Sequence, residues 1–202
     1  MLLNLLFPLS DTFGPFNLFQ YLTFRSGGAL MTSLIIAFLI GPSLIGWLKD
    51  RQGAGQPIRE DGPQGHLAKR GTPTMGGLMI LIAIVASTIL WSDWRNGYVW
   101  MALLVTAGFG IIGALDDYQK LSKRSSAGVP GRVKLICQLA ISVTAAGWIM
   151  QLHPADHSGG LALPFIKDFL WQLGWFFIPL AAFVMVGASN AVNLTDGLDG
   201  LA

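Results

Sequence analysis

The sequence YVWMALLVTAGFGIIGALDDYQK, residues 98–120, joins an apolar run directly to two adjacent carboxylates. Its first part, Tyr98–Leu115, approaches the roughly 20 apolar residues that a helix needs to cross a bilayer. The run ends at Asp116 and Asp117, which repel each other unless a cation or a shared proton neutralises them. The stretch therefore predicts a membrane-spanning helix that ends in a candidate functional pair. The alternative is that the helix simply surfaces there and its polar end is solvated.

The composition places this helix in an integral membrane protein. Of the 202 residues, 52% are hydrophobic and 12% are charged, whereas soluble domains usually carry about 25% charged residues. The net charge is only +2, so the position of the basic residues matters more than their number. The single cysteine, Cys137, cannot form an internal disulfide. Residues 1–24 lack a basic start and contain prolines, so we expect a retained interfacial segment and not a cleaved signal peptide.

Five apolar windows are candidate membrane spans, and we expect all of them to be helices. They are Ala29–Leu48, Thr74–Trp91, Tyr98–Leu115, Val133–Leu152 and Trp171–Ser189. The predicted fold class is all-α: a polytopic integral membrane bundle with five transmembrane helices. We expect residues 1–202 to form a single membrane domain.

Basic residues gather in two of the segments that connect these windows. They are Lys49, Arg51, Arg59, Lys69 and Arg70 in the first segment, and Lys120, Lys123, Arg124, Arg132 and Lys134 in the second. Because loops rich in lysine and arginine usually stay in the cytoplasm, the pattern predicts an outside N-terminus. Three polar stretches, residues 59–77, 116–134 and 190–200, then lie on the cytoplasmic face.

The last polar stretch, NAVNLTDGLDGLA (190–202), places Asn193, Asp196 and Asp199 three residues apart. A helical backbone would bring these side chains to one face. Ionisable residues at the edge of a membrane are functional candidates by default. The alternative is that Asp196 caps a helix and the neighbouring glycines only turn the chain.

The first polar stretch, REDGPQGHLAKRGTPTMGG (59–77), combines glycines and prolines with lysine and threonine donors. Such a loop can hold phosphate oxygens, although it lacks the spacing of a P-loop. Its basic residues can also serve as topology determinants or attract anionic lipid headgroups. Beside the carboxylates of the other two stretches, it favours phosphate chemistry with a divalent cation, and Mg²⁺ suits an all-oxygen site.

Together the three stretches closely resemble the phospho-N-acetylmuramoyl-pentapeptide transferases, a branch of the polyprenyl-phosphate N-acetylhexosamine-1-phosphate transferase superfamily. The resemblance implies a Mg²⁺-dependent transfer of phospho-MurNAc-pentapeptide from UDP-MurNAc-pentapeptide to undecaprenyl phosphate, giving lipid I and UMP. It implies a multi-pass protein of the bacterial cytoplasmic (inner) membrane, with its active face in the cytoplasm. The expected partners are the two substrates, membrane lipid and a second copy in a homodimer, with no nucleic acid.

The resemblance also implies roles for particular residues. The implied catalytic residues are Asp116, Asp117, Asp196 and Asp199, of which Asp116 and Asp117 are also the implied metal ligands. The implied substrate-binding residues are Lys69, Thr74, Lys120, Asn190 and Asn193.

The chain departs from the family in length, because family members have about ten spans. We therefore expect this chain to be the N-terminal half of a longer transferase and to be inactive alone. Two other function classes stay open. One is a cation-coupled transporter whose carboxylates carry Na⁺ or H⁺. The other is a non-catalytic membrane subunit that packs against a partner through glycine-bearing helix faces.

Overall fold

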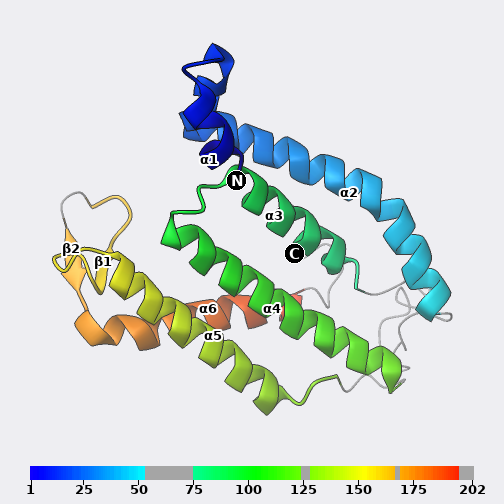
Figure 1. The fold of residues 1–202 in the computed structure, drawn as a ribbon. Coiled ribbons are helices and arrows are strands. Elements are labelled where there is room, and N and C mark those ends of the chain that lie inside the picture. The colour runs from blue at the N-terminus through cyan, green and yellow to red at the C-terminus, as the bar shows by residue number, and fades with distance from the viewer. Residues whose placement is uncertain (53–74, 124–127, 167–168, 196–202) are drawn as a thin grey trace. The chain divides into compact units, whose positions relative to one another are not determined.

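A computed structural model describes residues 1–52, 75–123, 128–166 and 169–195 of the chain. Helices dominate this part (Figure 1), which confirms the predicted all-α class. The α-helices are α1 (Leu2–Leu6), α2 (Leu22–Gln52), α3 (Gly77–Trp91), α4 (Gly97–Ser122), α5 (Gly131–Leu152) and α6 (Phe177–Thr195). The described residues also form the 3₁₀ helices η1 (Phe7–Leu9), η2 (Gly14–Gln20) and η4 (Gly174–Phe176).

The expected count of five full-length spans is not met in the described part of the chain. Four helical segments there are long and apolar enough to cross a membrane: α2, α4, α5 and Gly174–Asn193. The window predicted at Thr74–Trp91 corresponds to α3, which has 15 residues and is therefore about 22 Å long, less than the roughly 30 Å hydrocarbon core. The shortening has a local cause, because Met75 has a φ of 71°, and left-handed backbone does not continue a right-handed helix.

The window predicted at Trp171–Ser189 also begins differently from expected. Trp171 lies in a two-stranded antiparallel sheet of β1 (Gly160–Ala162) and β2 (Leu170–Gln172), where it pairs with Leu161. Gly174 follows with a φ of 55°, which separates the strand from the helical segment that leads into α6. Hydropathy alone could not distinguish an apolar strand residue from the start of a span.

The chain divides into two compact units, and the first comprises Met1–Val99 and Gly110–Pro130. In this unit α3 packs along α2. The Trp91 ring stacks on Phe19 with centroids 5.7 Å apart and meets Phe24 edge-on at 5.9 Å. Trp91 Nε1 also donates a hydrogen bond of 2.9 Å to Thr32 Oγ1. A Cβ atom at Gly28 would collide with the Trp91 indole, so glycine permits the close approach that joins the end of α3 to the start of α2.

The second unit comprises Trp100–Phe109 and Gly131–Ala202. Within it α5 packs against α6. The buried residues of α5 are Gln138, Ser142, Ala145 and Ala146. They recur at helical spacing and therefore form one stripe along α5. Most of this stripe is small, which permits close helix packing in a membrane.

Many large apolar side chains stay exposed on these helices. Leu30, Phe38 and Leu39 on α2 are 66%, 72% and 73% exposed, and only 6% of the most apolar window of α2 is buried. Apolar surface on this scale would be unfavourable in water but is favourable against lipid. The protein is therefore a multi-pass membrane protein.

Candidate active site

The carboxylate pair lies near the end of α4, and its first member is held on both oxygens. Asp116 is 8% exposed. Its Oδ1 accepts a hydrogen bond of 2.8 Å from the backbone N–H of Val129, and its Oδ2 lies 2.7 Å from Lys120 Nζ. Charge-assisted contacts of this length are among the stronger polar interactions in proteins. Asp116 therefore anchors the segment that follows α4.

Asp117 is more exposed than its neighbour. Lys120 Nζ lies 3.6 Å from Asp117 Oδ1, and the Asp117 side chain is 31% exposed, compared with 12% for that of Asp116. The repulsion expected between adjacent carboxylates is relieved by the Lys120 ammonium. Asp117 is therefore the member of the pair that is more accessible to a ligand.

Gly128 explains how the backbone comes so close to Asp116. A Cβ atom on this glycine would overlap the Asp116 carboxylate and lie 3.0 Å from Lys120 Cε. Only a residue without a side chain lets the Val129 N–H reach the carboxylate with the present geometry. The anchor thus depends on a glycine 12 residues beyond the acid it contacts.

The donor set limits the kind of metal ion that this end of α4 can hold. The described ranges contain no group of three or more histidine, cysteine, aspartate or glutamate side chains suited to a metal. Both oxygens of Asp116 are engaged, and Asp117 is the more exposed carboxylate of the pair. One carboxylate fits Mg²⁺, which commonly takes one or two protein ligands and completes its shell with water and substrate phosphates.

Two predicted substrate-binding residues lie near the end of α6. Asn190 donates through Nδ2 to Gln138 Oε1 at 2.8 Å and to Val186 O at 2.9 Å. Asn193 is exposed and lies three residues further along, so the two amides are neighbours on the helix surface.

The structure thus brings the predicted residues together in two groups. Asp116, Asp117 and Lys120 form one group in the first unit, and Asn190 and Asn193 lie together in the second. The expected convergence of all three polar stretches on one face stays a prediction. The remaining candidates, Lys69, Thr74, Asp196 and Asp199, lie outside the described residues.

Sequence reasoning missed two contributors to these groups, Gln138 and Gly128. Gln138 carries a usable signal, because it is an uncharged polar residue inside the apolar window 133–152, and such residues often form hydrogen bonds between helices. Gly128 carries none, because nothing in its sequence neighbourhood indicates the approach to Asp116.

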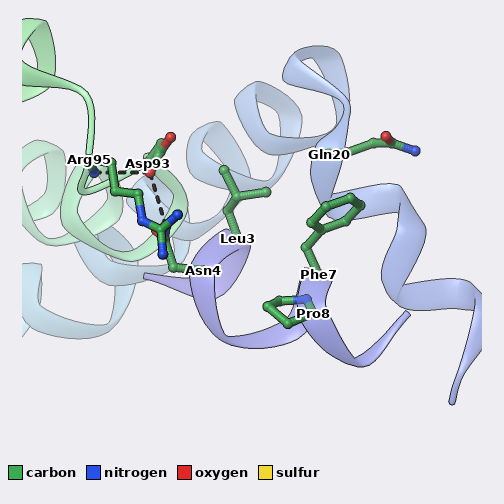
Figure 2. Close-up of a pocket in the computed structure, with 7 residues that line it drawn as sticks. All are labelled: Leu3, Asn4, Phe7, Pro8, Gln20, Asp93 and Arg95. Atoms are coloured by element: carbon green, nitrogen blue, oxygen red, sulfur yellow. Dashed lines mark hydrogen bonds between the residues drawn. The ribbon is translucent and has the colours of Figure 1, made fainter. Parts of the chain in front are cut away.

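A separate hollow lies beside the N-terminal segment (Figure 2). It has a volume of about 390 Å³, and its lining residues are Leu3, Asn4, Phe7, Pro8, Gln20, Asp93 and Arg95. Asp93 Oδ1 accepts hydrogen bonds from Asn4 Nδ2 and from the Arg95 backbone, both at 3.0 Å. These bonds, the Arg95 N–H first and the Asn4 amide second, hold the pKa of Asp93 below its usual range.

This hollow is remote from the carboxylate pair. Asp93 precedes the start of α4, whereas Asp116 lies 19 residues beyond Gly97 in that helix, which corresponds to about 28 Å. The hollow contains none of the site residues predicted from sequence. We assign it a structural role, in which Asp93 links α1 to the loop between α3 and α4.

The apolar helices of the described residues define a multi-pass membrane protein, and a carboxylate pair lies near the end of one of them, α4. The family model of glycosyl transferase family 4 matches residues 99–202, half of the chain, and the chain belongs to this family. A second pattern, signature 1 of phospho-N-acetylmuramoyl-pentapeptide-transferase, matches residues 69–81.

Two curated relatives carry the name of that signature. The chain is 61% identical over its whole length to the phospho-N-acetylmuramoyl-pentapeptide-transferase of Granulibacter bethesdensis, of which it covers 56%. It is 54% identical over 96% of its length to the protein of the same name from Ruegeria sp., of which it covers 54%. The chain therefore spans about half the length of the curated relatives it matches.

Proposed function

We propose that the protein of the relatives' full length, of which this chain is the N-terminal part, transfers phospho-MurNAc-pentapeptide from UDP-MurNAc-pentapeptide to undecaprenyl phosphate. The products are lipid I, a precursor in peptidoglycan biosynthesis, and UMP. One observation carries the proposal: residues 69–81 match the signature of this transferase. The chain that contains them is 61% identical, over its own whole length, to a relative of that name.

The proposed reaction is an exchange of phosphorus–oxygen bonds. A phosphate oxygen of undecaprenyl phosphate attacks the phosphorus that bears the sugar. The new bond joins that phosphorus to the lipid phosphate, the bond inside the UDP pyrophosphate breaks, and UMP leaves with the electron pair. Such transfers depend mainly on positioning and on stabilising negative charge. Lysine side chains would supply positive charge directly, and aspartate side chains would contribute by holding a divalent cation.

The geometry supports different roles for the two neighbouring acids. Asp117, the more exposed carboxylate, would hold Mg²⁺ or lie beside the attacking lipid phosphate. Asp116 and Lys120 fix the segment after α4 and so position Asp117. Mg²⁺, when bound, neutralises charge on the pyrophosphate. Lys69 and Thr74 lie within the signature match and are proposed to bind phosphate, while Asp196, Asp199 and Asn193 are proposed, from the family resemblance, to contact substrate.

The proposed location is the bacterial cytoplasmic membrane, with the site on the cytoplasmic face. Lys49 and Arg51 occupy the last turn of α2, and Lys120 occupies the last turn of α4. Basic residues at these ends support a cytoplasmic position by the positive-inside rule. The homodimer and the single membrane domain over residues 1–202 stay predictions.

Family membership separates this proposal from the two other function classes. Neither a cation-coupled transporter nor a non-catalytic subunit accounts for a transferase signature at residues 69–81. Asp116 and Asp117 also lie near the end of α4 and not at its centre, whereas a transporter usually places its ion site near the bilayer midplane.

The donor substrate provides the test of the proposal. The family-length protein in detergent is supplied with Mg²⁺, undecaprenyl phosphate and either UDP-MurNAc-pentapeptide or UDP-N-acetylglucosamine. UMP release is followed together with the lipid product. We expect turnover with the muramoyl donor alone. Turnover with UDP-N-acetylglucosamine alone would move the protein to another branch of the superfamily.

A further inference from the structure

Gln138 is an unusual residue in α5, because its primary amide lies inside an apolar helix and is 2% exposed. The neighbours of Gln138 on the buried stripe of α5 are a serine and two alanines. A buried amide is unfavourable unless its polar atoms are hydrogen-bonded. The partner of Gln138 is therefore the main clue to its role, and that partner is Asn190 of the NAVNLTDGLDGLA stretch.

The orientations of both amides are fixed by their surroundings. One terminal atom of Asn190 lies 2.9 Å from Val186 O, and a backbone carbonyl can only accept, so that atom must be the nitrogen. The same nitrogen lies 2.8 Å from the terminal atom of Gln138, which must then be Oε1. The network thus assigns which atom is nitrogen and which is oxygen in each amide.

This assignment determines what Asn190 can offer to a ligand. Its Nδ2 carries two hydrogens, and the two acceptors, Gln138 Oε1 and Val186 O, use both of them. The group that remains is Oδ1, which can only accept. No donor from the described residues has a hydrogen bond to Oδ1. A phosphate oxygen, which also only accepts, does not fit this atom.

We propose that Gln138 is a positioning residue. By accepting from Nδ2, it keeps Oδ1 of Asn190 on the side of the amide that faces away from Gln138. Because Oδ1 is an acceptor, Asn190 then binds either a divalent cation or an N–H or O–H donor of the nucleotide-sugar. It does not bind a phosphate oxygen. The inference rests on the proposed transferase function and assigns the chemistry of one residue in that site. Gln138 itself does not contact the substrate.

Substitutions at position 138 test the positioning role in the family-length protein. Gln138→Leu removes the acceptor at similar volume, whereas Gln138→Glu retains a carboxyl acceptor for Asn190 Nδ2. Ser142→Ala is the matched control, because Ser142 lies one turn further on the same buried stripe and is 0% exposed. The half-saturating concentration of Mg²⁺ is measured at saturating UDP-MurNAc-pentapeptide, and that of the donor substrate at saturating Mg²⁺.

We expect Gln138→Leu to raise one of these two concentrations about fivefold, the factor that one ordinary hydrogen bond represents. Gln138→Glu restores it to within about twofold, and Ser142→Ala leaves it unchanged. The concentration that moves identifies the source of the ligand group, cation or nucleotide-sugar. Equal losses in the Leu and Glu variants, or no change in either, would overturn the positioning role.

Substitutions of Asn190 test the acceptor role separately. Asn190→Asp keeps an acceptor oxygen at the Oδ1 position. Gln138 can turn its own amide to donate to the new carboxylate, so this variant loses only the bond to Val186 O, whereas Asn190→Leu removes the acceptor. We expect the aspartate variant to retain at least about tenfold more activity than the leucine variant. If Asn190 instead donated to phosphate, the added negative charge would make the aspartate variant the poorer one, and that result contradicts the proposal.

A spectroscopic measurement separates this inference from the proposed function. The side-chain ¹⁵N–H₂ signals of Asn190 are compared between the wild-type protein and Gln138→Leu after selective asparagine labelling. We expect an upfield shift of one of the two protons in the variant, and no shift in Ser142→Ala. If the wild-type protein makes no lipid I but shows this shift, the function fails and the geometry stands. If it makes lipid I without the shift, the positioning role fails.

Discussion

At the scale of single residues, Asp116 and Asp117 are chemically identical neighbours with different surroundings. Asp116 is buried and engaged on both oxygens, by Val129 N–H and Lys120 Nζ. Asp117 lies 3.6 Å from Lys120 Nζ, and its side chain is more exposed, at 31% compared with 12% for that of Asp116. This difference in exposure supports the proposal that the first acid has a structural role and the second binds a ligand.

Asp116→Asn should therefore change mainly stability, and Asp117→Asn mainly activity. Asp116→Asn places an amide nitrogen opposite the Lys120 ammonium, so we expect the free energy of unfolding to fall by about 2 kcal/mol. Asp117→Asn should leave unfolding unchanged and lower kcat by about 100-fold, as expected for a lost electrostatic contact with the reacting phosphates. Thermal unfolding and lipid I synthesis are measured on the same samples of the family-length protein. A stable, fully active Asp117→Asn variant would reject the assignment.

Gly128 provides an independent test of the Asp116 anchor. Because a Cβ atom at this position overlaps the Asp116 carboxylate, Gly128→Ala should displace the acid or the Val129 N–H, with an unfolding cost of about 1–3 kcal/mol. Gly131→Ala is the matched control, since a Cβ atom at Gly131 meets nothing within 4 Å. Thermal unfolding compares the two variants. Equal stability would show that the chain does not approach Asp116 as described.

At the scale of elements, the contact between α2 and α3 depends on a glycine and a tryptophan. Gly28→Ala forces a methyl group into the Trp91 indole, so we expect a loss of about 1–3 kcal/mol of stability and a change in tryptophan fluorescence. Gly27→Ala, one residue earlier, adds a methyl group that meets nothing within 4 Å and should be neutral or slightly stabilising in a helix. If Gly27→Ala were less stable than Gly28→Ala, the result would contradict the described packing.

The attachment of α1 to the loop before α4 should depend on pH through Asp93. Its pKa lies below the usual range because Arg95 N–H and Asn4 donate to the carboxylate. A group with a lowered folded-state pKa stabilises the fold above its unfolded pKa, and this stabilisation disappears as the pH falls through the folded pKa.

The test compares the Tm of the wild-type protein with that of Asp93→Asn across pH. We expect a small difference at neutral pH, since Asp93 is only partly buried and its charge is screened by solvent. The difference should vanish at acidic pH, below the ordinary range of aspartate. A difference that persists unchanged at low pH would indicate that the carboxylate charge plays no part in the attachment.

The elements also show how far sequence reasoning extends. The apolar run that ends at Asp116 and Asp117 predicted α4 correctly, because helix length and hydropathy are local properties. The same reasoning was wrong at Trp171, which lies in β2, because Gly174 adopts a positive φ before the helix begins. It was also wrong at the start of α3, because Met75 adopts a positive φ. Neither break has a clear hydropathy signal. Such breaks depend on the backbone and not on side-chain polarity.

The candidate site was predictable in its residue types but not in its internal contacts. Paired acids and amides at the ends of apolar runs are visible in the sequence, since charges near a membrane are costly to place without a role. The anchoring of Asp116 by Val129 N–H and of Asn190 by Gln138 depends on contacts between residues 13 and 52 positions apart. Spacing in one sequence does not encode such contacts.

At the scale of the whole molecule, we propose that the carboxylates and amides of this chain serve a transferase that makes lipid I. The decisive assay is the conversion of UDP-MurNAc-pentapeptide and undecaprenyl phosphate to lipid I in detergent. The 202-residue chain is compared with the protein extended to the length of its relatives, each with Mg²⁺ and with the metal chelated. We expect lipid I from the extended, Mg²⁺-supplied protein alone. No lipid I from the extended protein would contradict the transferase claim, and lipid I from the 202-residue chain would contradict the expectation that it is inactive alone.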